Sequence, residues 1–524
     1  MNHGVLQTFL SDLATRFGDD LAVVQQSGCV RITVEPSILA DVTARLHETG
    51  AILAGIVAEQ EAGGFRFHYP FCATGMGLWV IVELKTMAGE LVPSISSVAF
   101  AADWHEREIE DLFALHFSGH PLLGDFVLHD EIWPEGVAPM THSFSPVTPC
   151  ARKANPDYVP PQIVEAPGSF TMPVGPIYGG ITESAQFFLE TVGEEVIFTR
   201  PRFFYKYRGI EKVAEGREPH DLLLFAERLN GQAAFAHGLA CAQALETLGG
   251  TSVPPRAQWL RVMWAELERL RSHTATIAGI CKSTGLSVPT NLAYSLVESL
   301  LRLAGEYAGH RYLFGLLRPG GLACDLPNDR AIELTRRSAE CADRLSALGK
   351  ALSFDNSFLD RLEEVGVIEP DEARLYGLVG PVGRASGCTC DLRVDVPYAA
   401  YRSCAPVKSM ETEGDGYARL RVFLAEALES AHMARHAADS LPPGPVSCTW
   451  RPCAGRALGW AEAPAGTTCH FVSIDEDGRV GRYRLMPPAF SNWHAFQLAA
   501  ENFAFQDFPI TLATVGLSIA ESDR

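Results

Sequence analysis

The sequence has no pair of cysteines spaced as Cys-x-x-Cys, although it contains 13 cysteines in 524 residues. That spacing is typical of zinc and iron–sulfur ligand sets. The nearest groupings, Cys388 with Cys390 and Cys448 with Cys453, are too few to supply four ligands. An odd count in a long intracellular chain also argues against a disulfide framework. We therefore interpret most of these cysteines as buried structural thiols.

Long apolar runs and basic charge are also scarce. The nearest candidates for a membrane span, Leu78 to Leu84 and Phe508 to Ala520, are too short or too polar for the ~20 apolar residues that a bilayer requires. Met1 to Gln7 lacks the basic start and apolar run of an export signal. The 43 basic residues are outnumbered by 63 acidic ones, which gives a formal charge of −20 and argues against a nucleic-acid partner. We expect a cytoplasmic protein.

Nucleotide-binding motifs are missing as well. Gly75-Met76-Gly77 lacks the third glycine and the helix of a dinucleotide-binding turn, and the Gly-Lys-Ser/Thr of a P-loop does not occur. The sequence therefore offers no motif of its own for a cofactor, and NAD(H), if used, is expected on another subunit.

Residues 1–142 read as an α+β plait. Strand-like runs at Leu21 to Val34, Phe65 to Phe71 and Leu78 to Leu84 alternate with helical patterns at Ser37 to Thr49 and Trp104 to Phe113. Residues 143–169 form a proline-rich segment, which disfavours helix and central strand and is interpreted as a linker. With 47% hydrophobic residues, the chain can bury more than one core.

Residues 170–524 are predicted to be mainly α-helical, with short peripheral strands. Pro254-Pro255 introduces a helix with Leu260, Trp264 and Leu267 at helical spacing, and a second helix begins near Thr290. In the second helix, Leu292, Leu296, Leu300 and Leu303 are expected on one buried face. Short strands are expected at Cys469 to Ile474 and Arg482 to Met486, on either side of the turn signal Glu476-Asp477-Gly478.

Two sets of motifs resemble subunits of respiratory complex I. Glu106 to Phe113, followed by Phe117 and His120-Pro121, resembles the signature of its 30 kDa-type subunit. A second set resembles the 49 kDa-type subunit and its nickel–iron hydrogenase relatives, and comprises Gly175 to Glu183, Gly193-Glu194, Tyr207 to Lys212, Val253 to Gln258, Glu266 to His273, Gly380 to Gly387 with Asp391 and Arg393, and Pro397 to Tyr401. A fusion of both types resembles the large subunit of formate-hydrogenlyase and hydrogenase-4 type complexes. The resemblance implies a hydrogenase-large-subunit-like fold for residues 170–524.

The resemblance also shows which ligands are missing. In hydrogenase large subunits, the stretches similar to Glu227–His237 and Val515–Arg524 each carry a Cys-x-x-Cys pair that holds the metals. The matching positions here are Asn230, Ala233, Ser518 and Glu521. Soft thiolates select nickel and iron in such a site, so we do not expect a nickel–iron centre.

The chain fits neither group of relatives at every position. The Glu-containing end, Ser518 to Arg524, is similar to complex I, whereas the acid at Glu183 is similar to the hydrogenlyase type. The tyrosine and the first-loop histidine of the complex I quinone pocket would fall at Gly231 and Tyr178.

The predicted site is a cleft where the metals would lie. We expect a proton relay of Glu183, Arg208, Glu211, His237 and Asp391, because burial and neighbouring charges move the pKa values of such groups towards the working range. The residues expected to line the cleft are Tyr178, Asn230, Arg384 and Glu521. The alternative is that these are paired interior groups that hold loops in place.

Three functions remain open on this basis. The preferred one is an electron-transfer subunit of a complex I-like oxidoreductase, which would bind a quinone or other small acceptor beside an iron–sulfur cluster of a partner. The others are an active hydrogenase subunit with unusual ligands and a catalytically silent scaffold. The partners implied by the resemblance are a small iron–sulfur subunit, membrane antiporter-like subunits and other peripheral electron-transfer subunits. They would hold the chain at the inner face of the cell membrane.

Overall fold

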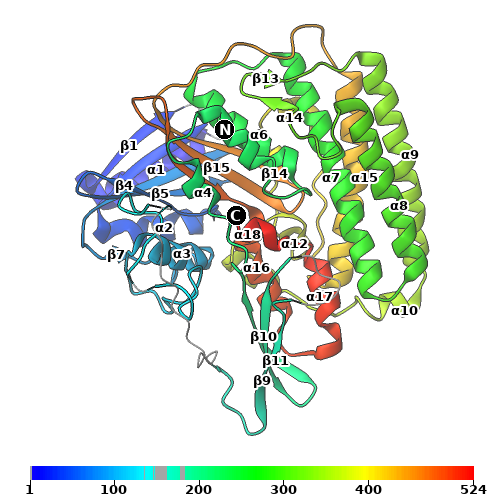
Figure 1. Ribbon diagram of the computed structural model, residues 1–524, viewed down its shortest axis with the longest axis horizontal. Helices are drawn as coiled ribbons and strands as arrows, with labels where there is room; N and C mark the ends of the chain where they lie inside the picture. The colour runs from blue at the N-terminus through cyan, green and yellow to red at the C-terminus, as the bar shows by residue number, and fades with distance from the viewer. Residues whose placement is uncertain (1–2, 27, 135, 146, 148–161, 178–182) are drawn as a thin grey trace.

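The computed structural model describes residues 3–26, 28–134, 136–145, 147, 162–177 and 183–524. Figure 1 shows the N-terminal strands on one side, a bundle of long helices on the other, and a small sheet between them. This mixed N-terminal sheet and helical C-terminal part agree with the predicted fold class. Within the described residues, no helix is both long and apolar enough to span a membrane.

The N-terminal sheet has the strand order β1-β2-β6-β5-β3, with β4 paired to β5. Its strands are β1 (Leu21–Gln26), β2 (Cys29–Val34), β3 (Ile52–Leu53), β4 (Val57–Glu61), β5 (Gly64–Ala73) and β6 (Leu78–Met87). Among the described strand pairs of this sheet, β2 and β6 run parallel and the others are antiparallel. Its helices are α1 (His3–Phe17), α2 (Leu39–Glu48) and α3 (Asp103–Phe113), and the predicted helices at 37–49 and 104–113 are thereby confirmed. The buried Leu13, Val42 and Leu46 pack in the same core as the strands.

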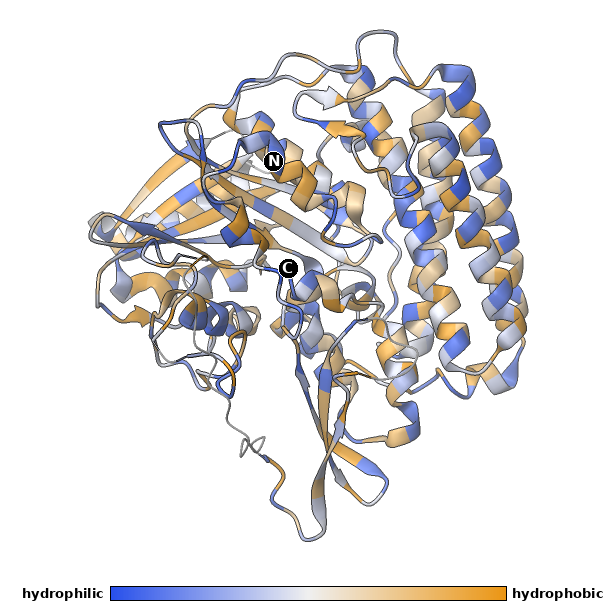
Figure 2. Cartoon of the chain, viewed as in Figure 1, coloured by the Kyte–Doolittle hydropathy of each residue, from blue (hydrophilic) through white to orange (hydrophobic). Residues whose placement is uncertain are grey.

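The helical bundle consists of α7 (Pro255–Ser283), α8 (Ser287–Ala308), α9 (Asn328–Leu352) and α15 (Gly416–Asp439). α7 is buried along most of its length, while α8 and α9 alternate polar and apolar stripes (Figure 2). The helices predicted after Pro254-Pro255 and near Thr290 are confirmed. The expectation for Leu292 was wrong: it is exposed, whereas Leu296, Leu300 and Leu303 are buried, because only one side of this helix packs against the bundle.

The small central sheet contains β14 (Gly455–Ala463), β15 (Gly466–Ile474) and β16 (Val480–Met486). β15 and β16 are longer than predicted, β14 was not predicted, and all three strands are mostly buried. Their contacts explain why: Arg482 Nε donates to Ala58 O on the N-terminal sheet, and Gly459 lies directly against helix α6 (Ala234–Leu248). The sheet is therefore the middle layer between β4–β6 and α6.

A third sheet projects from the body in Figure 1. It has the order β17-β11-β10-β9, with β9 (Ser169–Val174), β10 (Gln186–Val192), β11 (Glu195–Arg202) and β17 (Phe503–Ala504). The remaining elements are short and connect these layers: β7 (Val92–Pro93), β8 (Phe117–Ser118), β12 (Leu317–Arg318), β13 (Gly321–Leu322), α4 (Ile210–Ala214), α5 (Leu222–Ala226), α10 (Asn356–Leu359), α11 (Pro370–Leu375), α12 (Gly380–Ala385), α13 (Leu392–Asp395), α14 (Tyr401–Cys404), α16 (Pro488–Ala499), α17 (Phe508–Val515) and α18 (Ile519–Ser522). The domain limits 1–142 and 170–524 stay predictions, and residues 148–161 of the linker lie outside the described residues.

Replacing Gly459 with alanine should separate the middle sheet from α6. An added Cβ would lie 2.0 Å from Ala240 O and 2.5 Å from Ala244 N, and backbone cannot yield cheaply. We expect Gly459→Ala to lower the free energy of unfolding by about 1–3 kcal/mol in urea titrations. Gly279→Ala is the matched control, because Gly279 lies within α7 with nothing inside 4 Å of its Cβ position. Equal effects of the two changes would contradict this close packing.

Candidate functional site

Two loops far apart in sequence meet at one small cavity. The first loop follows α5 and leads into α6, and the second connects α17 to α18. All four positions aligned above with metal-binding cysteines contribute to its wall. The lining residues are Asn230, Gln232, Ala233, Ser272, His273, Thr276, Phe423, Pro464, Ala465, Gly516, Ser518 and Glu521. The two stretches therefore lie side by side, as predicted.

The cavity is narrow, and its polar groups carry oxygen and nitrogen atoms. It has room for about one water molecule. Its side chains offer amide, hydroxyl, imidazole and carboxylate groups but no sulfur. Among the described residues, no group of three or more His, Cys, Asp and Glu is arranged to hold a metal ion.

Direct hydrogen bonds close the two loops onto each other. Asn230 Nδ2 donates to Glu521 Oε1 at 2.8 Å. Arg208 donates to Leu229 O at 3.1 Å and to Ala520 O at 2.7 Å, so its guanidinium bridges both loops. Glu183 Oε2 accepts from Ala520 N at 2.7 Å, at the first turn of α18. Four of the predicted residues, Asn230, Glu521, Arg208 and Glu183, thus fix the loops around the cavity.

Behind Glu521 the polar contacts continue inward. His237 on α6 places Nε2 3.4 Å from Glu521 Oε1, and its Nδ1 lies 3.1 Å from His470 Nε2. His470 on β15 in turn contacts Tyr483 Oη on β16 at 2.8 Å through Nδ1. The middle sheet therefore continues the cavity's hydrogen bonding into the interior.

A second cavity, lined by residues of α7 and α8, lies close to the loop of residues 230–233. Arg271 on α7 holds this loop by donating to Gly231 O at 2.8 Å and Gln232 O at 3.0 Å. Glu268, one turn earlier, accepts from Phe235 N and Ala236 N at the start of α6, and burial raises its pKa to about 7. A Cβ at Gly231 would lie 3.4 Å from Cε1 of Tyr312, so a tyrosine from another segment fills the space beside this glycine.

Glu211 belongs to a separate buried ion-pair cluster. Its carboxylate contacts Arg482 at 2.7 Å, Arg484 at 3.2 Å and Arg524 at 3.1 Å. Arg484 and Arg524 also pair with Glu108 on α3. Burial raises the pKa of Glu211, but the guanidinium charges of Arg484, Arg482 and Arg524 outweigh it and lower this pKa to about 2.

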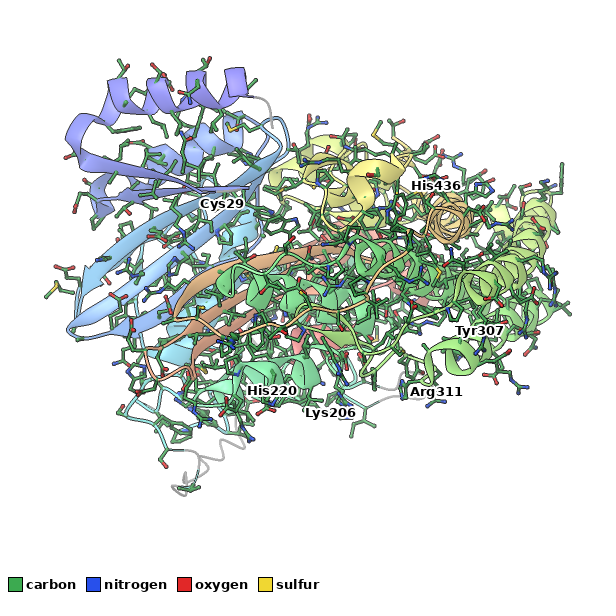
Figure 3. All side chains as sticks on the ribbon, turned by 90° about the horizontal axis from the view of Figure 1, so that it is seen from above. Cys29, Lys206, His220, Tyr307, Arg311 and His436 are labelled. Carbon is green, nitrogen blue, oxygen red and sulfur yellow. The ribbon has the colours of Figure 1, made fainter. Side chains whose placement is uncertain are left out.

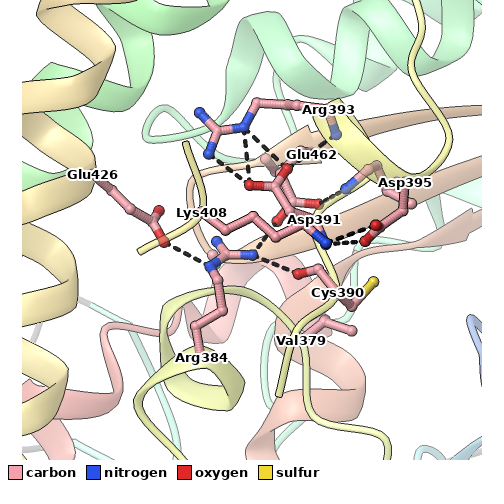
Figure 4. Close-up of polar contacts among 12 residues, drawn as sticks. Val379, Arg384, Cys390, Asp391, Arg393, Asp395, Lys408, Glu426 and Glu462 are labelled. Carbon is pink, nitrogen blue, oxygen red and sulfur yellow. Dashed lines mark hydrogen bonds and ion pairs between the residues drawn. The ribbon is translucent and has the colours of Figure 1, made fainter. Parts of the chain in front are cut away.

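Arg384 and Asp391 belong to another buried network, shown in Figure 4. Arg384 contacts Glu426 at 2.7 Å and Glu462 at 3.0 Å, and Asp391 contacts Arg393 at 2.7 Å. This network reaches the cavity through His273, whose Nε2 lies 3.1 Å from Glu426.

The structure therefore divides the predicted site residues into separate groups. Asn230 and Glu521 line the cavity, His237 lies behind Glu521, and Glu183 and Arg208 hold the loops. Glu211, Arg384 and Asp391 lie in the ion-pair networks, and Tyr178 lies outside the described residues. Their predicted roles in proton transfer or binding stay predictions.

Sequence reasoning did not find His470, Tyr483, Glu268 or Arg524. His470 and Tyr483 lie on strands, and a strand pattern in the sequence predicts only which face a side chain is on. Nothing in the sequence therefore indicated that His470 contacts His237 on α6, or that Tyr483 contacts His470. Glu268 was named only as part of the motif Glu266 to His273. Its place in that motif, two residues after Glu266 on a long helix, was the only feature of the sequence that could have marked it as a site residue.

Comparison with known proteins gives matches along most of the chain. The family model of the 30 kDa subunit of respiratory-chain NADH dehydrogenase matches residues 32–149, and that of its 49 kDa subunit matches residues 284–452. The nickel-dependent hydrogenase model matches residues 208–276, which include the first loop of the cavity.

Curated relatives match nearly full length. Formate hydrogenlyase subunit 5 of Escherichia coli (strain K12) is 28% identical, over 94% of this chain and 88% of the relative. Hydrogenase-4 component G of the same organism is 27% identical with the same coverage. The C/D subunit of the NADH-quinone oxidoreductase of Acinetobacter baylyi is 26% identical, over 83% of this chain and 80% of the relative.

A solved structure shares the fold. A chain of the membrane-bound sulfane sulfur reductase, an archaeal respiratory membrane complex, superposes with a TM-score of 0.65. The match covers 68% of this chain and 99% of that one at 23% identity.

Removing the Glu211 charge should destabilise the chain in a pH-dependent way. Glu211→Gln leaves buried arginines without a counter-charge, and we expect a loss of about 3–5 kcal/mol at pH 7. The folded-state pKa of about 2 lies below the ordinary 4.5, so this contribution is present above pH 4.5 and disappears as the pH falls towards 2. Denaturant titrations from pH 7 to pH 2 should show the difference from the parent protein shrinking over that window.

The control is Glu215→Gln, which removes a more exposed ion pair with Lys212. It should cost no more than about 1 kcal/mol, with little change in acid sensitivity. A Glu211→Gln protein as stable as the control would contradict the assigned ion pairs.

Proposed function

We propose that this chain, which belongs to the family that fuses the 30 kDa-type and 49 kDa-type subunits of respiratory complex I, is the peripheral large subunit of a membrane-associated oxidoreductase complex. The family includes relatives of formate hydrogenlyase subunit 5 and hydrogenase-4 component G. In this role it takes part in electron transfer without a nickel–iron centre of its own. The chain is then an oxidoreductase subunit whose acceptor binds at or beside the cavity.

One observation carries the proposal: Asn230 and Glu521, at two of the four thiolate positions of hydrogenases, are hydrogen-bonded to each other at 2.8 Å. Ala233 has no donor atom, and Ser518 offers only a hydroxyl. This donor set does not fit nickel and iron, which such sites bind through soft thiolates. The water-sized free volume between the loops supports the same conclusion.

The cavity chemistry suits proton transfer to a small acceptor. Glu521 and His237 form a buried acid–base pair, with Glu521 in the cavity wall. An acceptor such as a quinone takes up protons as it is reduced, and a carboxyl group beside it can donate such a proton. The electrons would come from an iron–sulfur cluster in a partner, and NAD(H), if used by the complex, would bind to another subunit.

The surface near the first loop favours an acidic docking partner. Arg208, Arg228 and Arg311 are exposed although the whole chain carries a formal charge of −20. Lys206 and Arg311 lie on the same side of the molecule (Figure 3). We propose that the small iron–sulfur subunit docks here, and that antiporter-like membrane subunits and other electron-transfer subunits bind elsewhere. Through them the chain would be held at the inner face of the cell membrane.

Metal analysis of the purified complex tests the missing centre. We expect nickel well below one equivalent per chain and no hydrogen uptake. Stoichiometric nickel together with hydrogen uptake would instead establish the second candidate, a hydrogenase with unusual ligands.

Turnover of the intact complex tests whether the cavity is more than a scaffold. We expect Glu183→Gln and His237→Gln each to lower turnover about 10-fold or more, in line with general acid–base groups, while the complex stays assembled on size-exclusion chromatography. His432→Gln, at an exposed histidine of α15, is the control and should leave turnover unchanged. Unchanged turnover in all three variants would support a catalytically silent scaffold.

A further inference from the structure

Four buried side chains form one continuous hydrogen-bonded line from the cavity into the middle sheet. They are Glu521, His237, His470 and Tyr483, each at most 1% exposed. The contacts measure 3.4 Å, 3.1 Å and 2.8 Å in that order. They come from α18, α6, β15 and β16, so the line exists only in the folded chain.

The direction of this line follows from counting donors and acceptors. A neutral imidazole has one N–H and one bare nitrogen, so the partner of one nitrogen decides the role of the other. Burial holds the pKa of His470 well below its usual value and the pKa of Tyr483 well above its usual value. Both groups are therefore neutral near pH 7.

The amide of Asn230 sets the orientation at the cavity end. Asn230 Oδ1 accepts from Gln232 N at 2.9 Å, so its Nδ2 is the group that donates to Glu521 Oε1. Glu521 Oε1 is thus an acceptor, and the nearby His237 Nε2 completes the set as a second donor. In the neutral ring of His237 this leaves Nδ1 bare, so Nδ1 accepts.

Two groups can donate to His237 Nδ1. His470 Nε2 and Thr468 Oγ1 both lie 3.1 Å away. His470 Nε2 carries a proton only while His470 Nδ1 is bare, and the Tyr483 hydroxyl, 2.8 Å from Nδ1, favours that tautomer by donating to it.

We propose that His470 and Tyr483 are positioning residues that keep the proton of His237 on Nε2, directed at Glu521. Tyr483 sets the tautomer of His470, and His470 sets that of His237. Neither touches the cavity or its occupant, since His237 and Glu521 stand between. The use of this arrangement in turnover rests on the function proposed above.

The other carboxylate oxygen of Glu521 shows where a proton can move. Oε2 is buried and has no hydrogen-bond partner among the described residues. A proton carried on Oε2 can pass through a water molecule in the cavity to an acceptor beside it: the O–H bond of Glu521 breaks, its electron pair stays on Oε2, and the acceptor gains a proton. The N–H groups of Asn230 and His237 then stabilise the carboxylate that remains.

Ring-¹⁵N-labelled histidine in the full purified chain reports the tautomer directly by NMR. The signal of His237 is assigned by its loss in His237→Gln. We expect a protonated Nε2 and a bare Nδ1 in the parent protein. In Tyr483→Phe the proton on His237 Nε2 should fall to about half occupancy, because His470 no longer has a preferred tautomer. Tyr312→Phe, outside this line, should change nothing.

Substitutions of His470 give a second test with its own rescue. In His470→Gln the amide N–H₂ can still donate to His237 Nδ1, so the parent tautomer should be retained. In His470→Leu the donor is lost and both tautomers should appear. This pair decides the question should Tyr483→Phe fail to fold.

An unchanged His237 tautomer in both Tyr483→Phe and His470→Leu would overturn the proposal and assign the role to Thr468. The tautomer is read on the chain itself, whereas the proposed function is tested by nickel content and turnover of the complex. The two can therefore fail independently.

Discussion

The buried ion pairs of Glu211 and Glu108 with Arg482, Arg484 and Arg524 are the interaction on which the rest of the structure depends. They join α3 of the N-terminal region, α4, the strand β16 and the last residue of the chain. Isolated charges cannot remain ionised in such an interior, so each carboxylate is held only where the guanidinium groups converge. The cluster therefore specifies how the N-terminal sheet, the middle sheet and the C-terminal segment fit together.

The position of the C-terminal segment in turn determines the cavity. Asp523 accepts from Phe204 N at 2.7 Å, and Arg208 N donates to Asp523 O at 3.0 Å, so the segment lies along residues 204–208. Burial raises the pKa of Asp523 to about 6. With the segment held in this way, Glu521 meets Asn230 and His237. An arrangement that holds metals through sulfur in related hydrogenases here holds a carboxyl group through nitrogen donors.

Much of the fold could be predicted from local patterns. The helix from Pro255 onward and the hairpin β15–β16 follow from a proline at the first turn and from the Asp477-Gly478 turn signal. The meeting of the two loops was also predicted, but from a resemblance and not from periodicity. The length and burial of β14 were not predicted, because its close fit to α6 depends on Gly459, whose role is visible only once Ala240 lies beside it.

The sequence alone determined the chemistry available at the site: amide, methyl, hydroxyl and carboxyl groups at Asn230, Ala233, Ser518 and Glu521, in place of sulfur. It also indicated the resemblance to complex I and hydrogenase subunits, because the order of the motifs can be read along the sequence. Only the tertiary structure decided which polar residues act together. Glu211 and Asp391 lie in buried ion-pair clusters, whereas His470 and Tyr483 extend the hydrogen-bonded line behind His237. The physical reason is that hydrogen bonds and ion pairs act over about 3 Å between atoms. Residues that meet at this distance can lie more than 200 positions apart in the sequence, so the sequence alone does not show which of them meet.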